Sequence, residues 1–387
     1  MSTREKVALV LGAGAPNSPL MAGALAAMYK RGKTFDIIYT TGGGAVIGLL
    51  FVAPNGKGPY EALRGIVEMM GVHDLIYSLI PIGYKTFFKP GPFTRPFRRL
   101  GQLVKIKEFP LGPIPAGVTS RQPDVLRRYF NERIENWMKY KGGQFTRLYN
   151  DLVDLWVSIL TPSTTNPFSQ GMCAPFPFFD EMVDFSKLLD FPGQFYMNAW
   201  NVTDSKMDIF TKGELTPAHF RAALAYPSIY PPAEVNGKFY FEGADHDPLN
   251  FGNLTTRVDR GHIKTVMVID ILGSLEPYLV RRPRSLWDAY GISIMTPVVA
   301  LARKNLEHFE NYQNRDEKGK PIFELLKLKF PIPESLQPHI MEWSYSNLSH
   351  LWDIGYVVGE KFCEDNWEKI PDRRIYVDEP LVSAEEE

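Results

Sequence analysis

The sequence predicts an α/β fold with a mainly parallel sheet, and two strand–glycine–helix units near the N-terminus are the observations that predict it. Residues 6–11 (KVALVL) form a short aliphatic run that ends in glycines, which is typical of a buried strand entering a tight turn. Residues 36–40 (DIIYT) form a second such run, which leads into Gly42-Gly43-Gly44 and an apolar helical stretch over 45–53. Because the same order recurs, we expect two parallel strands joined by a right-handed crossover.

Later segments fit the same class of fold. Residues 19–30 keep apolar side chains at helical spacing, and Gly32 lies where a helix C-cap is expected. The chain from residue 285 onward has a mostly helical pattern. Four further runs predict strands, at 194–202, 207–210, 238–241 and 265–271.

The composition excludes several classes of protein. Of the 387 residues, 44% are hydrophobic and 22% are charged, which excludes disordered and fibrous chains. The 43 Lys+Arg residues balance 44 Asp+Glu residues, so the basic excess of a dedicated nucleic-acid-binding protein is missing. Cys173 and Cys363 form neither a disulfide framework nor a metal-ligand pattern, which favours a reducing compartment.

The sequence contains no pattern typical of export or of membrane insertion. The N-terminal residues MSTREKVALVLGAG lack the apolar region of a signal peptide. The longest apolar stretch, 45–53, is far shorter than the ~20 residues of a spanning helix. We therefore expect a cytoplasmic protein, with peripheral contact to a membrane surface as one option.

The pattern changes between residues 76 and 193, where prolines and aromatic residues are dense and strands no longer alternate with helices. We expect this segment to be a partly helical cap inserted into an α/β core made of residues 1–75 and 194–387. Amphipathic helices are predicted over 123–139 and 144–160. The first part of the cap mixes phenylalanines with lysines and arginines. This mixture suits a lid that rests on a membrane or, as we favour, a packed cap with solvated charges.

The first stretch that could take part in binding or catalysis is the glycine turn LGAGAPN, residues 11–17. Glycines allow the backbone N–H groups of Gly12, Ala13 and Gly14 to converge on an anion, and the following helix adds its positive dipole end. A dinucleotide-binding loop is the alternative, but Asn17 breaks the G-x-G-x-x-G pattern.

The second stretch is YTTGGGAVIG, residues 39–48, a sharp turn between a strand and a helix. A nucleophile elbow has the form G-x-S-x-G, and this frame reads Thr40-Thr41-Gly42-Gly43-Gly44 here. The turn is therefore present, and Gly42 stands where the serine would be.

The third stretch, residues 221–250, contains a helix, a Pro-Pro turn, a hairpin strand and then Glu242-Gly243-Ala244. This order delivers the carboxylate of Glu242 at the end of a strand, where it can orient or deprotonate a reacting group. Acidic side chains at strand ends most often cap loops, which is the simpler interpretation.

In this order the three stretches resemble the patatin-like phospholipase family. That family has a glycine-rich oxyanion turn, an elbow, a R-A-x-x-A-x-P-x-x-x-P-P segment and an acidic-Gly-Gly/Ala triplet. Residues 201–204 (NVTD) and 352–356 (WDIGY) are similar to two further family patterns, so the resemblance covers residues 5–75 and 195–365. It implies a three-layer fold with a mainly parallel central sheet, and acyl-ester hydrolysis by a Ser–Asp dyad without histidine.

Both members of that dyad differ here, because Gly42 stands in place of the serine and Glu242 in place of the aspartate. Without a hydroxyl at position 42 no acyl-enzyme forms there, and Thr41 and Ser18 are the nearby hydroxyls. We predict that Glu242, its pKa raised by an apolar cleft, acts as a general base on water or on substrate. The N–H groups of the first glycine turn and of Gly43 are predicted to hold the oxyanion.

Several functions stay open at this point. An activated water would hydrolyse an ester or a thioester, whereas removal of a proton next to a carbonyl would make the protein an isomerase or lyase. The site could instead be catalytically inactive and bind a lipid or acyl ligand, or belong to an esterase disabled by substitution of its serine. We favour hydrolysis because it keeps the substrate class that the resemblance implies.

The remaining candidates concern the ligand, which we expect to be an acyl lipid or an acyl thioester. Phe176, Phe178 and Phe179 are expected to wall an acyl cavity, with core packing as the alternative. The arginines of 281–284 could clamp a carboxylate or phosphate, although a solvated charge run is more common. Residues 245–247 (DHD) are not expected to bind a metal, because neighbouring side chains on a strand point to opposite faces. We expect neither a metal nor a cofactor.

Overall fold

A mixed sheet of eight strands forms the centre of the protein, in a computed structural model that describes residues 5–14, 16–106, 143–175, 179–256, 263–272, 279 and 281–372. The strand order is β5-β6-β3-β2-β1-β7-β8, with β4 paired to β3 off this path. The strands are β1 (Lys6–Leu11), β2 (Ile37–Thr40), β3 (Gln194–Asn201), β4 (Lys206–Thr211), β5 (Ala233–Val235), β6 (Lys238–Glu242), β7 (Ile263–Asp270) and β8 (Glu324–Lys329). All six predicted strands are confirmed, with small shifts at their ends.

The central strands are parallel, as the sequence predicts. β1 pairs in parallel with β2 and β7, and the parallel pairs continue to β3 on one side and β8 on the other. β4, β6 and β5 add antiparallel strands beyond β3. In the register of the first pair, Leu11 lies opposite Thr40. The glycine turns that follow these two residues therefore leave the same edge of the sheet side by side.

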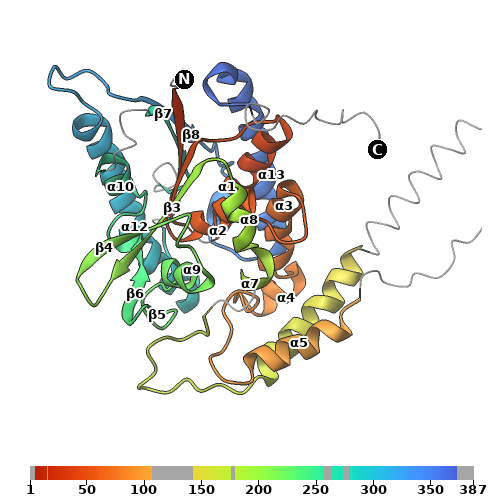
Figure 1. Cartoon of the computed structure of the whole chain (residues 1–387). Helices are drawn as coiled ribbons and strands as arrows, with labels where there is room; N and C mark the ends of the chain where they lie inside the picture. The colour runs from red at the N-terminus through yellow and green to blue at the C-terminus, as the bar shows by residue number, and fades with distance from the viewer. Residues whose placement is uncertain are drawn as a thin grey trace, which may run out of the picture.

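Helices cover both faces of the sheet and give the three layers that the family resemblance implies. α1, α3 and α13 lie on one face, and α10 and α12 lie on the other (Figure 1). The described α-helices of four or more residues are α1 (Ser18–Lys30), α2 (Gly43–Val52), α3 (Pro59–Met70), α4 (Asp74–Leu79), α5 (Thr94–Val104), α7 (Phe179–Met182), α8 (Phe185–Asp190), α9 (Pro217–Ala223), α10 (Phe251–Thr256), α12 (Leu286–His308), α13 (Tyr345–Asp365) and one over residues 143–160.

Glycines bring α1 and α13 into unusually close contact. A Cβ atom on Gly23 would lie 2.1 Å from the carbonyl oxygen of Trp352, and one on Gly355 would lie 2.2 Å from that of Leu20. Any larger residue at either place would force the two backbones apart. This contact fixes α1, whose N-terminus follows the first glycine turn.

The C-terminal part is mostly helical as predicted, but one strand in it was missed. The segment after residue 285 contains α12 and α13 as expected, but residues 324–329 (ELLKLK) form β8, parallel to β7. Leu326 and Leu328 are buried on one side of this strand while its lysines point away. The run has only six residues, so its alternation is easily mistaken for part of a helix.

The segment 76–193 combines packed and exposed parts, and its status as a separate cap stays a prediction. The helix predicted over 144–160 is confirmed, whereas the one over 123–139 lies outside the described residues. Phe87 packs against Trp343, with ring centroids 5.3 Å apart, but Phe93 is largely exposed. Val183, Leu188 and Phe191 near the end of the segment are buried in the core as well, so the described part of the segment is packed at both ends.

Two further features concern the whole chain. Both cysteines are buried free thiols. Across the described ranges, no helix combines the length and the apolar character needed to cross a bilayer.

Candidate active site

The turn after β2 has the backbone of a nucleophile elbow without its side chain. Gly42 has φ +50° and ψ −123°, a conformation that residues with a side chain rarely adopt. The Thr41 N–H donates to the Leu11 carbonyl at 3.1 Å, which ties this turn to the end of β1. A Cβ on Gly43 would lie only 2.2 Å from the carbonyl oxygen of Gly14, so the two glycine turns are in direct contact.

β6 brings Glu242 to the same edge of the sheet. Glu242 is the last residue of β6 and lies opposite Ala199, two residues beyond the β3 residue that pairs with Thr40. Its N–H donates to the Ala225 carbonyl at 3.0 Å, within the segment RAALAYPSIYPP. A Cβ on Gly42 would lie 2.0 Å from Glu242 Oε1. The carboxyl group thus occupies the space that a side chain at position 42 would need.

Glu242 faces a cavity of about 120 Å³ with mainly apolar walls. Ala13, Gly14 and Gly43 line one side of it, and Met70 and Val298 are among its apolar residues. Burial raises the pKa of Glu242 to about 8, and the negative charge of nearby Asp245 contributes in the same direction. Burial among apolar side chains thus raises the pKa of Glu242, as the sequence predicted. The catalytic role of Glu242 stays a prediction.

The predicted oxyanion donors differ in what surrounds them. The Ala13 N–H donates to the Pro248 carbonyl at 2.9 Å, so this donor is already engaged and the prediction for it needs correction. Gly12 packs against Leu249. Gly14 and Gly43 both line the cavity, and the N–H of Gly43 belongs to the first turn of α2, where no carbonyl of the same helix can accept it. Gly14 and Gly43 are the better candidates.

Two polar residues near Glu242 were missed at the sequence level. Asn198 Nδ2 donates to the Asp247 carbonyl at 2.9 Å, and its Oδ1 has no partner among the described residues. Tyr226 donates from its hydroxyl to Asp245 at 2.9 Å and lines the cavity. Asn198 lies in the middle of a strand without a motif, and Tyr226 occupies a variable position of its segment, so no signal marked them.

The two hydroxyls next to the glycine turns have different surroundings. Thr41 Oγ1 donates to the Asp247 carbonyl at 3.2 Å, which agrees with the expectation that this side chain points away from the elbow tip. Ser18, the first residue of α1, lines the cavity together with Glu242. Ser18 is therefore the better placed of the two as an alternative nucleophile.

A model of the patatin-like phospholipase family matches residues 9–254, which include both glycine turns and Glu242. The chain belongs to the patatin-like phospholipase family. Lysophospholipase NTE1 of Saccharomyces cerevisiae is 25% identical over 161 residues, which are 42% of this chain and 8% of that protein. Lysophospholipase NTE1 of Kluyveromyces lactis is 21% identical over 239 residues, 60% of this chain and 16% of that protein. The matched part is thus a small fraction of either relative.

Among solved structures, VipD from Legionella pneumophila superposes with a TM-score of 0.36 and 11% identity. The superposition covers 94% of this chain and 67% of that one.

The predicted aromatic wall of this patatin-like site stays a prediction. Phe176 and Phe178 lie outside the described residues, and Phe179 is described only as the first residue of α7. The described aromatic side chains at the cavity include Phe87 and Trp343. Neither stands in a family motif, so the sequence alone did not indicate their role.

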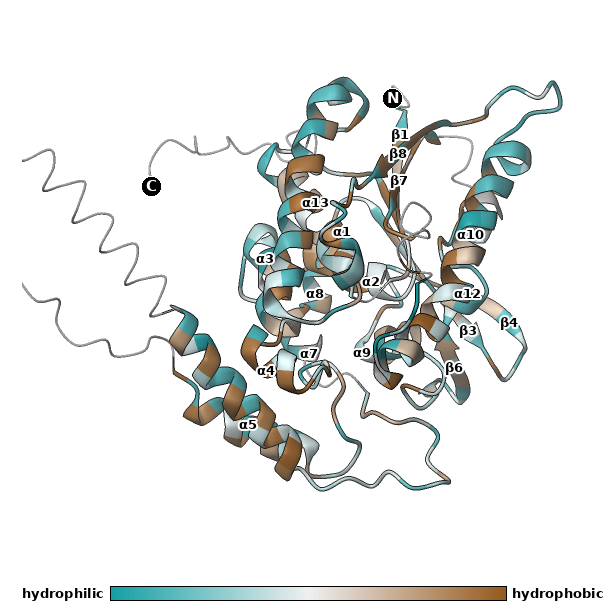
Figure 2. Cartoon of the chain, turned by 180° about the vertical axis from the view of Figure 1, so that it is seen from behind, coloured by the Kyte–Doolittle hydropathy of each residue, from teal (hydrophilic) through white to brown (hydrophobic). Residues whose placement is uncertain are grey.

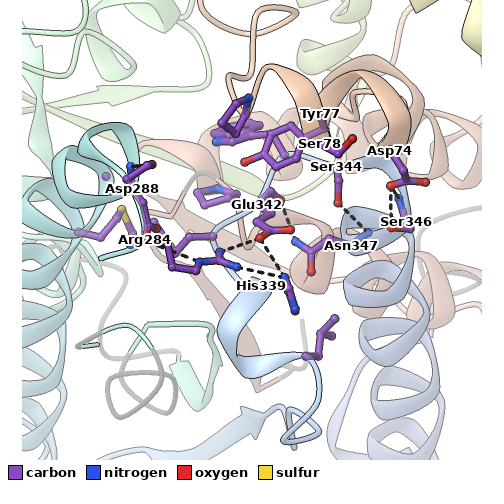
Figure 3. Close-up of a pocket in the computed structure, with 18 of the residues that line it drawn as sticks. Asp74, Tyr77, Ser78, Arg284, Asp288, His339, Glu342, Ser344, Ser346 and Asn347 are labelled. Atoms are coloured by element: carbon purple, nitrogen blue, oxygen red, sulfur yellow. Dashed lines mark hydrogen bonds and ion pairs between the residues drawn. The ribbon is translucent and has the colours of Figure 1, made fainter. Parts of the chain in front are cut away.

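A second cavity of about 800 Å³ adjoins the first and shares five lining residues with it: Phe87, Ile229, Ile294, Met295 and Trp343. Figure 3 shows its polar side, where Arg284 donates to Glu342 at 2.6 Å and His339 lies 2.9 Å from the same carboxylate. Arg281 binds Asp288 through two hydrogen bonds of 2.8 Å. Arg281 and Arg284 are thus ion-paired, and Arg284 lines the cavity.

Residues 245–247 support the turn after Glu242, where the N–H groups of His246 and Asp247 both donate to the Gly243 carbonyl. Asp247 accepts the N–H groups of Phe251 at 3.2 Å and Gly252 at 2.8 Å, which caps α10. His246 stacks on Trp200 with ring centroids 3.6 Å apart. No cluster of metal-binding side chains occurs in the part of the chain that the structure describes.

Proposed function

We propose that this chain is a hydrolase-related enzyme for acyl esters or acyl thioesters, in which Glu242 is the general base. Membership of the patatin-like phospholipase family and the name lysophospholipase of its relatives support a lipid as the substrate class. The observation that carries the proposal is the position of the Glu242 carboxyl, which takes the place of a side chain at Gly42 and faces an apolar cavity.

The proposed reaction is a direct hydrolysis. Glu242 accepts a proton from a water molecule, and the water oxygen bonds to the acyl carbon. The N–H groups of Gly14 and Gly43 donate to the carbonyl oxygen as it gains negative charge. The bond from the acyl carbon to the leaving oxygen or sulfur then breaks, and Glu242 returns its proton to the leaving group.

The pKa of about 8 gives this mechanism a characteristic pH dependence. At pH 7 roughly one Glu242 in ten is ionised, because the pH lies about one unit below the pKa. The rate should therefore rise about tenfold per pH unit below pH 8 and level off above it. A rate that falls above pH 8 would assign Glu242 the role of a general acid instead.

The central experiment compares wild type with Glu242→Gln on a panel of lysophospholipids, simple esters and acyl thioesters. Glutamine keeps the shape of the side chain but accepts no proton, so we expect turnover to fall by about 10²-fold or more. Glu234→Gln, the same change on an exposed side chain of β5, serves as the matched control. Unchanged turnover in Glu242→Gln would contradict the proposal.

Labelled water tests for covalent attack by the Glu242 carboxylate. In H₂¹⁸O the base mechanism places the label in the product acid and leaves the Glu242 carboxyl unlabelled over many turnovers. A labelled Glu242 would mean that the carboxylate itself attacked the acyl group and that water then attacked the Glu242 carbonyl carbon of the mixed anhydride, whereas attack of water on the acyl carbon would leave Glu242 unlabelled. Ser18→Ala tests the serine hydroxyl at the cavity, and we expect this variant to retain turnover.

The alternatives predict different outcomes in the same experiments. A non-catalytic lipid- or acyl-binding protein is favoured by the missing hydroxyl at position 42, and it would bind fatty acyl ligands without turnover in any variant. A disabled esterase would gain activity only in Gly42→Ser. An isomerase or lyase with an enolate intermediate would exchange substrate hydrogens next to the carbonyl with D₂O, and Glu242→Gln would stop this exchange.

A further inference from the structure

Two paired helices carry their apolar side chains on the outside. α5 and the helix over residues 143–160 lie against each other at the edge of the molecule (Figure 1), and a Cβ on Gly101 would lie 2.5 Å from a methyl group of Val157. The helix-pair face is defined by the exposed apolar residues of both helices: Phe93, Leu100, Leu103, Val104, Phe145, Tyr149, Leu152, Trp156, Ile159 and Leu160. Apolar colour on the outer surface of these helices is visible in Figure 2.

The spacing of these residues reverses the usual arrangement of an amphipathic helix. In the second helix the exposed apolar side chains recur every three or four residues, at 145, 149, 152, 156 and 159. Such a stripe normally faces the core of a globular protein. Trp156 is 58% exposed and Ile159 is 49% exposed, so this stripe instead faces away from the described core.

The charges around the helix-pair face are positive. Residues 75–106 contain six lysines and arginines and no aspartate or glutamate, and Arg95 and Arg99 are exposed on α5. The second helix carries two acidic side chains, each paired with one of these six basic residues, and Arg98 pairs with Glu181, so three of the six positive charges are compensated. Asp151 lies 2.5 Å from Lys85, and Asp154 lies 2.6 Å from Lys105. The face therefore combines apolar, aromatic and basic side chains.

The apolar surface continues toward the entrance of the larger cavity. On α4, Leu75 and Leu79 are 56% and 76% exposed, while Tyr77 and Ser78 of the same helix line the cavity of about 800 Å³. That cavity shares residues with the one at Glu242. A surface bound at the helix-pair face would therefore lie beside the path to the site.

We propose that the helix-pair face binds the surface of an anionic lipid bilayer. Phenylalanine, tryptophan and leucine side chains enter the boundary between head groups and acyl chains, and arginines contact the anionic head groups. The positive charge argues for an anionic membrane over a second copy of this chain, whose identical face would repel it. The purpose of such binding rests on the proposed lipid hydrolysis, but the binding itself does not.

Vesicle co-sedimentation at physiological salt tests the proposal directly. We expect the full chain to bind vesicles that contain about 30% phosphatidylserine and to bind pure phosphatidylcholine vesicles much more weakly. The double variant Leu100→Ser/Leu103→Ser should lose about tenfold or more in vesicle affinity. The double variant Leu189→Ser/Val357→Ser is the control, because its side chains are 60% and 64% exposed on other helices and should leave binding unchanged.

The charges are tested separately, and two results would overturn the proposal. Arg95→Gln/Arg99→Gln should remove most of the preference for anionic vesicles. Equal vesicle binding by wild type and by Leu100→Ser/Leu103→Ser would exclude this face as the lipid contact. A lipid-free dimer that dissociates in the same variant would show that the face pairs two copies instead. Glu242→Gln should bind vesicles like wild type, so a failure of the proposed catalysis leaves this test interpretable.

Discussion

At position 42 a backbone suited to a catalytic serine meets a carboxyl group that fills the serine's space. The positive φ of Gly42 and the 2.0 Å separation of its Cβ position from Glu242 Oε1 both disfavour a side chain at this position. A side chain at 42 would displace the carboxyl, and an aspartate at 242 would be one methylene shorter. Glycine and glutamate therefore fit together as a pair, and a change at one residue alters the environment of the other.

The pKa of Glu242 makes a prediction about stability. Its folded value of about 8 lies above the ordinary 4.5, so between these pH values the folded state holds a proton that the unfolded state has released. Stability from this group is therefore lost as pH rises from 4.5 to 8, and the penalty is complete above pH 8. The shift corresponds to roughly 5 kcal/mol at about 1.4 kcal/mol per unit.

Glu242→Gln removes this titration. We expect the variant to unfold at a higher urea concentration than wild type at pH 9, and at nearly the same concentration at pH 4.5. Glu234→Gln is the control, because this side chain is exposed. Equal stabilities of wild type and Glu242→Gln at pH 9 would mean that Glu242 ionises without penalty and that its site is well hydrated.

The sequence predicted the main contact of the site but not its details. The order of motifs was sufficient to place Gly42 and Glu242 together, because each motif ends a strand at one edge of the sheet. The loss of Ala13 as a donor could not be predicted, since it depends on the carbonyl of Pro248, a loop residue without a motif. Asn198 and Tyr226 likewise act through contacts that only the folded chain creates.

Between elements, the packing of α1 on α13 depends on positions without side chains. We expect Gly355→Ala to lower the free energy of unfolding by about 2–4 kcal/mol, because the added methyl group would lie 2.2 Å from the Leu20 carbonyl oxygen. Gly65→Ala in α3 is the matched control, since a Cβ there meets nothing within 4 Å. The free energy of unfolding of this control variant should rise by up to about 1 kcal/mol, because alanine has a higher helix propensity than glycine. Urea denaturation measures the free energy of unfolding of both variants. Equal changes in Gly355→Ala and Gly65→Ala would contradict close packing as the cause.

The elements differ in how clearly the sequence marks them. Strands β1 and β2 are fully buried apart from one end residue and read as unbroken aliphatic runs, so they were found. β5 has three residues and β8 has six, and both lie at the edges of the sheet, where pairing with a neighbour decides the conformation more than local preference does. The close contact between α1 and α13 at Gly355 was also not predicted, because a single glycine within a helix does not indicate which element packs against it.

For the molecule as a whole, the helix pair must be held to the core despite its exposed outer face. A buried ion pair provides this link. Lys85 Nζ lies 2.5 Å from Asp151 and donates to the Gly71 carbonyl at 2.7 Å, while Asp151 accepts the N–H of His73 at 2.5 Å. Burial raises the pKa of Asp151, and the charge of Lys85 opposes this rise. Removal of either charged side chain therefore leaves the other one buried without a counter-charge.

A double-mutant cycle at this pair tests the attachment of the helix pair. Lys85→Met alone and Asp151→Asn alone should each lower the free energy of unfolding by about 3–5 kcal/mol, since each leaves one buried charge without its counter-charge. In Lys85→Met/Asp151→Asn no buried charge lacks a counter-charge, and the asparagine side-chain oxygen can still accept the N–H of His73. The double variant should therefore be more stable than the sum of the single losses predicts, by about 1–3 kcal/mol. Additive losses would show that the two side chains act independently. With coupling, cleavage after residue 89 in the double variant should be slower than the sum of the two single-variant effects predicts, because detachment of the helix pair from the core exposes this site before the sheet unfolds.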